Sequence, residues 1–151
     1  MKFFEKIKIS SSNKDSKTIL FVCVENAGRS QMAEGFFKKY APNGFKTLSA
    51  GTKPVPQINP IVVQAMKEVG IDISKQKSKM LIDEMIRESD KVINMGCMDK
   101  NFCPTVWLPK VIEWGMEDPK GQSIEKVREI RKKKKKRVKE LVAEITTTTE
   151  R

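Results

Sequence analysis

Residues 18–23 read TILFVC, a continuous run of apolar and β-branched side chains that leads into a polar turn with Asn26 and Gly28. Such a run is typical of a strand that is buried on both faces of a parallel sheet. Residues 30–40 then carry apolar side chains near helical spacing, with Ser30 as a candidate N-cap. A buried strand, a tight turn and a helix in this order predict an α/β fold.

The rest of the chain continues this alternation. Further strands are predicted at 45–49, 91–95 and 111–113, and further helices at 60–69, 79–87 and 122–145. We therefore expect a single three-layer α/β/α sandwich around a four-stranded parallel sheet. The length of 151 residues suits one domain, which we place at 18–145, between a flexible extension at 1–17 and a frayed tail at 146–151.

The composition excludes several classes of site. The chain has no histidine, so it has no histidine base and no Ser-His-Asp triad. Its three cysteines include no Cys-x-x-Cys pair, so a four-ligand zinc site of cysteine and histidine cannot form. We find no run of about 18 apolar residues and no secretory signal. An odd cysteine count without such a signal indicates a reducing compartment. We expect a cytoplasmic monomer without metal or cofactor.

The net charge of +11 is concentrated in two places. Residues 131–137 are seven consecutive basic residues, and the first 17 residues contribute three more positive charges. The remainder is nearly neutral, so the domain as a whole is not strongly basic. The run could bind nucleic acid, but no aromatic residues interleave with it to stack bases. We therefore interpret it as a solvated face of the last helix and expect no nucleic-acid partner.

The loop after the first strand carries the clearest chemical signal. It consists of Cys23, Val24, Glu25, Asn26, Ala27, Gly28, Arg29 and Ser30. Backbone N–H groups at a helix N-terminus beside the carboxyl end of a parallel strand would cradle an oxyanion of phosphate size. Arg29 would clamp two oxygens of that ion, and Ser30 would donate to a Cys23 thiolate, which this positive field favours. Asn26 would pin the loop, and the carboxylate of Glu25 is expected to point to solvent. The alternative is a buried structural cysteine beside a surface arginine.

The two remaining cysteines, Cys97 and Cys103, fall in the long loop 96–109 after the third predicted strand. The carboxyl end of that strand should lie on the same edge of the sheet as Cys23. Two thiols near a nucleophilic cysteine allow a thiol–disulfide shuttle, and five intervening residues let a disulfide close if the loop bends. The alternative is that both are small buried fillers.

Several ordered motifs resemble one known superfamily. The segment 22–37, VCVENAGRSQMAEGFF, is similar to the signature of the low-molecular-weight protein tyrosine phosphatases, and most like that of the arsenate reductases within them. The resemblance extends over roughly 18–140 and includes SAGT at 49–52, Asn59-Pro60, AMKEVGIDIS at 65–74 and WGMEDPKG at 114–121.

The resemblance implies a role for each candidate residue. Cys23 would attack arsenate held by the loop amides and Arg29, while Asp118 would protonate the departing oxygen. Cys97 would then attack Cys23 and release arsenite, and Cys103 would attack Cys97 and free Cys23. Thioredoxin or a similar thiol reductant would reduce the resulting Cys97–Cys103 disulfide. Phosphate and sulfate would compete with arsenate for the loop.

The superfamily also implies an alternative activity. A phosphatase would use Cys23, Arg29 and Asp118 to form and hydrolyse a phosphocysteine, with the other cysteines incidental. Phosphotyrosine phosphatases usually have aromatic residues beside this aspartate, whereas here Lys120 and Gly121 follow the Asp118-Pro119 pair. A plain Asp-Pro turn is the alternative for Asp118.

Some arsenate reductases of this kind bind potassium near the oxyanion loop. The matching positions here are Asn26, Glu34 and Ser49, and Lys79 stands where some bacterial members carry aspartate. Because a lysine repels a cation, we predict no metal at these positions.

Overall fold

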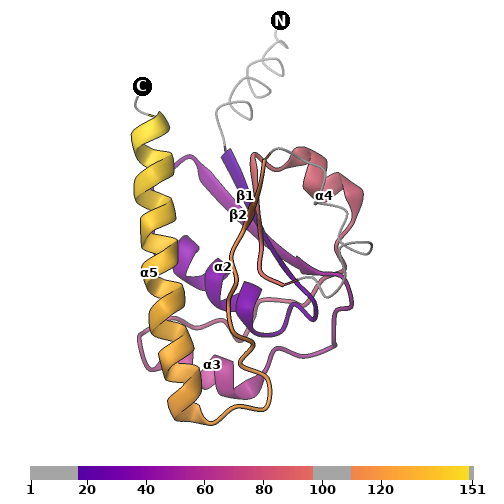
Figure 1. Ribbon diagram of the computed structural model, residues 1–151, viewed down its shortest axis with the longest axis vertical. Coiled ribbons are helices and arrows are strands. Elements are labelled where there is room, and N and C mark those ends of the chain that lie inside the picture. Colours follow the sequence, from indigo (N-terminus) through magenta and orange to yellow (C-terminus); the bar gives the residue numbers. More distant parts are fainter. Residues whose placement is uncertain (1–16, 97–109, 150–151) are drawn as a thin grey trace, which may run out of the picture.

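The computed structural model describes residues 17–96 and 110–149, which form an α/β fold (Figure 1). The strands in these ranges are β1 (Lys17–Cys23), β2 (Phe45–Gly51), β3 (Lys91–Asn94) and β4 (Val111–Glu113). The helices are α2 (Arg29–Tyr40), α3 (Pro60–Lys67), α4 (Asp83–Glu88) and α5 (Ile124–Thr149).

The four strands form one parallel sheet, as predicted, and the structure shows their order as β2-β1-β3-β4. β1 is therefore central, with β2 on one side and β3 on the other. At its carboxyl end, Cys23 pairs with Gly51 of β2, and Val22 pairs with Asn94 of β3. Because the chain leaves β1 toward one neighbour and returns on the other side, a crevice for ligands opens at this end of the strand.

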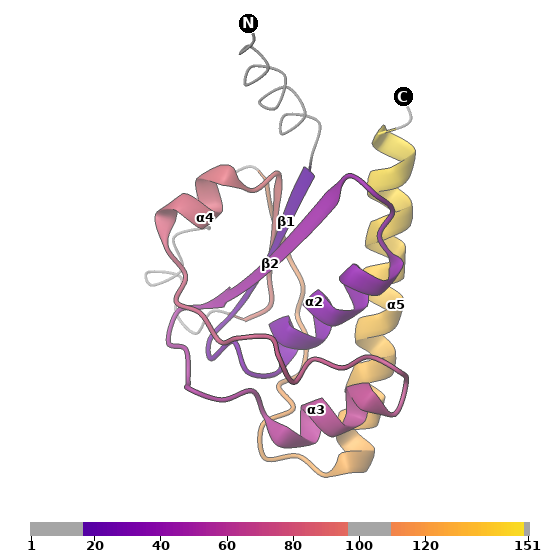
Figure 2. The same ribbon diagram turned by 180° about the vertical axis from the view of Figure 1, so that it is seen from behind.

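Side chains of β1 alternate between two separate cores. Ile19 and Phe21 face the larger core, which also contains buried residues of α2, α3 and α5. Leu20 and Val22 face a smaller core closed by Ile86 of α4. Figures 1 and 2 show α4 on one face of the sheet and the other three helices on the opposite face. The predicted three-layer sandwich is thus confirmed.

Two helix starts differ from the sequence predictions. The residue preceding α2 at its N-cap is Gly28, which offers no side-chain cap, and Ser30 lies inside the helix. The helix predicted at 79–87 begins only at Asp83. Gly51 donates its N–H to the carbonyl of Lys79 and accepts from the N–H of Leu81, both at 2.8 Å. These bonds hold 79–81 extended against the end of β2, so a helix cannot start there.

The last helix is longer than predicted. α5 continues through Thr149, four residues beyond the predicted end at 145. The hydroxyl of Thr147 donates to the carbonyl of Ala143 at 2.9 Å, four residues back, which is compatible with helical backbone. None of the helices in the described ranges is long and apolar enough to cross a membrane.

The basic run 131–137 is not a uniformly solvated face. Lys134 is completely buried, and the side chain of Arg131 is only 13% exposed. Arg131 donates to the carbonyl of Ala65 at 2.7 Å and also pairs with Glu68. The prediction of a solvated face is therefore wrong for these two residues, because one side of α5 packs against α2 and α3.

Glu68, which follows α3, anchors that helix to α5. Its carboxylate accepts from Arg128 Nη2 and Arg131 Nη1, each at 2.7 Å. The hydrogen bonds from Arg128 and then Arg131 lower the pKa of Glu68 from 4.5 to about 2. Because the pKa is lower in the folded state, this stabilisation is complete above pH 4.5 and is lost as the pH falls toward about 2.

Glu68→Gln is therefore expected to destabilise the fold at neutral pH but to make little difference near pH 2. Urea unfolding of both proteins across this range measures the change, and the exposed Glu140→Gln on α5 is the control. A difference between wild type and Glu68→Gln that stays constant with pH contradicts the prediction.

Candidate active site

Cys23 ends β1 and is a buried, free thiol. Its Sγ lies 3.0 Å from Oγ of Ser30, in the first turn of α2. That hydroxyl accepts from Nδ2 of Asn26 at 2.7 Å, so its own hydrogen is free to point at the sulfur. The predicted contact between Ser30 and Cys23 is present, and its geometry allows the hydroxyl to donate to the sulfur.

Asn26 pins the loop, as expected. It is completely buried and has a positive φ of 51°, a conformation that asparagine tolerates better than most residues. Its Oδ1 accepts from the backbone N–H of Lys79 at 2.8 Å, and its carbonyl accepts from Nε2 of Gln31 at 2.9 Å. Asn26 thereby joins the loop to α2 and to the extended segment after residue 76, which fixes the position of the Cys23–Ser30 pair.

Arg29 is the first residue of α2, and its side chain reaches the segment before α5. Nη1 donates to the carbonyl of Met116 at 3.4 Å, and Nη2 lies 3.5 Å from Oδ2 of Asp118. Nε is buried and has no hydrogen-bond partner among the described residues. A tetrahedral oxyanion in front of Cys23 would supply the acceptor that Nε lacks.

Gly96 makes room for this arginine. It has a φ of +106°, and a Cβ at this position would approach Nη1 of Arg29 to 2.5 Å. Any other residue would therefore be strained and would displace the guanidinium.

The segment before α5 brings a carboxylate and an ammonium to the oxyanion loop. Oδ1 of Asp118 accepts from the backbone N–H of Lys120 at 3.0 Å, which orients Oδ2 toward Arg29. Nζ of Lys120 lies 2.7 Å from Oε2 of Glu25. This hydrogen bond is the main cause that raises the pKa of Lys120. The expectation that Glu25 simply points to solvent is wrong, because its carboxylate bridges the two loops.

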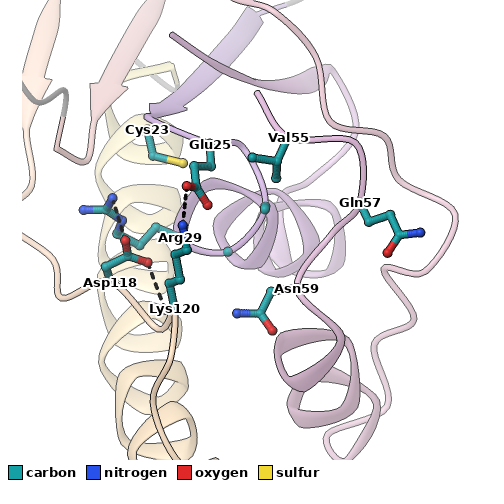
Figure 3. A pocket seen from close by; sticks show the side chains of 10 residues that line it. Cys23, Glu25, Arg29, Val55, Gln57, Asn59, Asp118 and Lys120 are labelled. Carbon is teal, nitrogen blue, oxygen red and sulfur yellow. Dashed lines mark hydrogen bonds and ion pairs between the residues drawn. The ribbon is translucent and has the colours of Figure 1, made fainter. Parts of the chain in front are cut away.

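These side chains surround one pocket of about 190 Å³, shown in Figure 3. Cys23 lies at its base, with Arg29, Asp118 and Lys120 on one side (Figure 3). Val55, Gln57 and Asn59, from the loop before α3, line the other side, and Glu25, Ala27 and Gly28 complete it. Among the residues within 17–96 and 110–149, none that line the pocket is aromatic. The pocket therefore has the size and polarity for a small oxyanion.

The positions that match the potassium site of some relatives are held by protein contacts. The hydroxyl of Ser49 donates to Oε1 of Glu34, and Oδ1 of Asn26 accepts from Lys79. Nζ of Lys79 donates to the carbonyl of Lys77 at 2.7 Å. Burial lowers the pKa of Lys79, while the nearby Glu34 partly opposes this shift.

Cys97 and Cys103 lie outside the described residues, so their predicted approach to Cys23 stays a prediction. Within 17–96 and 110–149, the structure brings together Cys23, Arg29, Ser30 and Asp118 as expected. Sequence reasoning missed Lys120 and Gln57 in the pocket lining, which carry no local motif, and it missed the burial of Lys134. The signal for Lys134 is its helical register, because it falls in line with Ile130 and Val138, both buried.

The whole described domain matches one family model, that of low molecular weight phosphotyrosine protein phosphatase, across residues 18–151. The chain belongs to this family. An arsenate reductase from Brevibacillus brevis is 39% identical over 109 residues, which cover 72% of this chain and 81% of that relative. The superfamily resemblance of segment 22–37, and its likeness to the arsenate reductases, are thereby confirmed.

Two solved structures of the family are also similar. One, of an arsenate reductase in the phosphate-binding state, has a TM-score of 0.76 and 37% identity, and the match covers 85% of this chain and 98% of that one. Another, of a thioredoxin-dependent arsenate reductase from Corynebacterium glutamicum, has a TM-score of 0.75 and 33% identity. That match covers 96% of this chain and 73% of the other.

Proposed function

We propose that this chain is an arsenate reductase that reduces arsenate to arsenite with electrons from its own thiols. The main supporting observation is the pocket, where Cys23, Arg29 and Asp118 meet in about 190 Å³ and where none of the described lining residues is aromatic. These residues suit a bare tetrahedral oxyanion and offer no surface for a phenyl ring. The arsenate reductases among its relatives, one of them thioredoxin-dependent, support the assignment.

The first step forms a thiol–arsenate adduct. The Cys23 thiolate, held by the Ser30 hydroxyl, attacks arsenic, so that an As–S bond forms and an As–O bond breaks. Asp118 protonates the departing oxygen, which leaves as water. Arg29 and the backbone N–H groups at the start of α2 bind the remaining oxygens and stabilise their charge.

The second step transfers the electrons. Cys97 attacks Sγ of Cys23, and the electron pair of the broken As–S bond stays on arsenic, which leaves as arsenite. Cys103 then attacks Sγ of Cys97 and expels Cys23 as a thiolate. Two thiols are oxidised for each arsenate reduced, and thioredoxin or a similar reductant restores them.

A thiol count tests this sequence directly. Fully reduced protein has three thiols, and arsenate without external reductant is expected to lower the count to one, with the disulfide mapped to Cys97–Cys103. Phosphate is the control and should leave all three thiols. Cys97→Ser should abolish multiple turnover with thioredoxin. An unchanged count, or full turnover by Cys97→Ser, contradicts the proposal.

The second candidate is a phosphatase of small phosphomonoesters, which the family model favours. Cys23, Arg29 and Asp118 would then form and hydrolyse a phosphocysteine. Efficient hydrolysis of an aryl phosphate that Cys97→Ser leaves unchanged, together with no thiol loss in arsenate, would establish this candidate instead.

A further inference from the structure

Lys134 occupies a position that an apolar residue would normally take. On α5, residues 127, 130, 138, 141 and 145 form a buried apolar stripe, and Lys134 lies within it at 0% exposure. Removing an ammonium group from water is costly, and an apolar side chain here would avoid that cost. Its neighbours in the basic run, such as Lys132 and Lys136, are exposed. Lys134 is the residue of this run whose side chain is fully buried.

The ammonium of Lys134 points toward the end of the sheet that carries Cys23. Its Nζ lies 3.0 Å from Sδ of Met95, the residue that follows β3. The backbone N–H of Met95 donates to the carbonyl of Val22 at 2.7 Å, directly before Cys23. A thioether is a weak acceptor, and none of the described carboxylates forms an ion pair with Lys134.

The charges that act on Lys134 are mainly those of the pocket. Burial lowers the pKa of Lys134 from 10.5 to about 7. The Cys23 thiolate opposes this shift most, followed by Asp118, while Arg29 and Arg137 add to it. These groups belong to β1, to the segment before α5, to α2 and to α5 itself. Electrostatic coupling is reciprocal, so a charge on Lys134 must favour the Cys23 thiolate as much as the thiolate favours that charge.

We propose that Lys134 is a positioning residue of this site, whose buried ammonium stabilises the Cys23 thiolate from the side of α5. Arg29 lines the pocket and is available to the oxyanion, whereas Lys134 has no exposed surface and cannot touch a substrate. Below its pKa of about 7, the charge of Lys134 therefore acts on the sulfur whether the pocket is empty or filled. This role rests on the proposed use of Cys23 as the nucleophile.

The test measures the reactivity of Cys23 without any arsenate chemistry. In the Cys97→Ser/Cys103→Ser background, Cys23 is the only thiol, and its alkylation by iodoacetamide is followed from about pH 5 to 10. Lys134→Met is compared with Lys132→Met, which removes the same charge from an exposed position of the same helix. We expect the midpoint of the rate profile to rise by about one pH unit in Lys134→Met. Below that midpoint, alkylation should be about tenfold slower, while Lys132→Met should match the parent.

A folded Lys134→Met protein with an unchanged midpoint would overturn the inference and leave Lys134 as a core residue only. If Lys134→Met does not fold, Lys134→Gln provides the same comparison with a polar side chain. The outcome is independent of the proposed function, because a shifted midpoint in a protein that never reduces arsenate would remove the reductase assignment and keep the role of Lys134.

Discussion

Arg29→Lys is expected to lower kcat/KM for arsenate reduction by about 10³-fold while leaving the protein folded. Lysine keeps the positive charge but loses the planar fork, so it cannot bind two oxygens while also facing Asp118 and the carbonyl of Met116. The buried Nε, which has no partner within 17–96 and 110–149, is also lost. A coupled assay with thioredoxin and its reductase measures the rate at several arsenate concentrations.

Arg128→Lys is the matched control, because Arg128 pairs with Glu68 on the surface and lies outside the pocket lining. It should reduce arsenate like the wild type. If Arg29→Lys also remains within a few-fold of the wild type, Arg29 acts only as a positive charge, and the proposed bidentate binding is wrong.

Asn26→Ala is expected to reduce the free energy of unfolding by about 3 kcal/mol, a large effect for one substitution. The change leaves the N–H of Lys79 without its acceptor and Ser30 without its donor. It also places alanine at a φ of 51°, which asparagine tolerates better. Urea unfolding at neutral pH gives the free energy, and thermal unfolding should show a midpoint lowered by about 6–12 °C.

Two variants separate these contributions. Asn26→Gly loses the same hydrogen bonds but accepts the positive φ, so it should be about 1 kcal/mol more stable than Asn26→Ala. Asn59→Ala removes only the exposed cap of α3, whose Oδ1 accepts from Ile61, and should cost about 1 kcal/mol. Equal stability of all three variants would show that Asn26 does not pin the loop.

Much of the site could be predicted because its parts are contiguous in the chain. Cys23 ends a strand that is recognisable from its apolar run, and Arg29 begins the helix six residues later. The loop between them is too short to place these residues far apart. The contact between Ser30 and Cys23 follows from the same local geometry, since the first turn of α2 faces the end of β1.

Three of the wrong predictions concern contacts between distant segments. The segment 79–81 has helical character in the sequence, but its hydrogen bonds with Gly51 hold it extended. Glu25 has no local reason to pair with Lys120, which lies 95 residues away in the chain. Its many charges make the run 131–137 appear fully solvated in the sequence. Lys134 is nevertheless buried, because it lies on the face of α5 that packs against the core.

The sequence alone determined the order of strands and helices, the parallel sheet and the Cys23–Arg29 loop, because these depend on hydrophobic periodicity and on neighbours within a few residues. Contacts that no motif indicated emerged from the three-dimensional packing. Lys120 pairs with Glu25 across 95 residues, and Lys134 lies in the core beside Met95. Such contacts depend on how helices and loops pack onto the sheet, and packing is a property of the whole fold that no local pattern encodes.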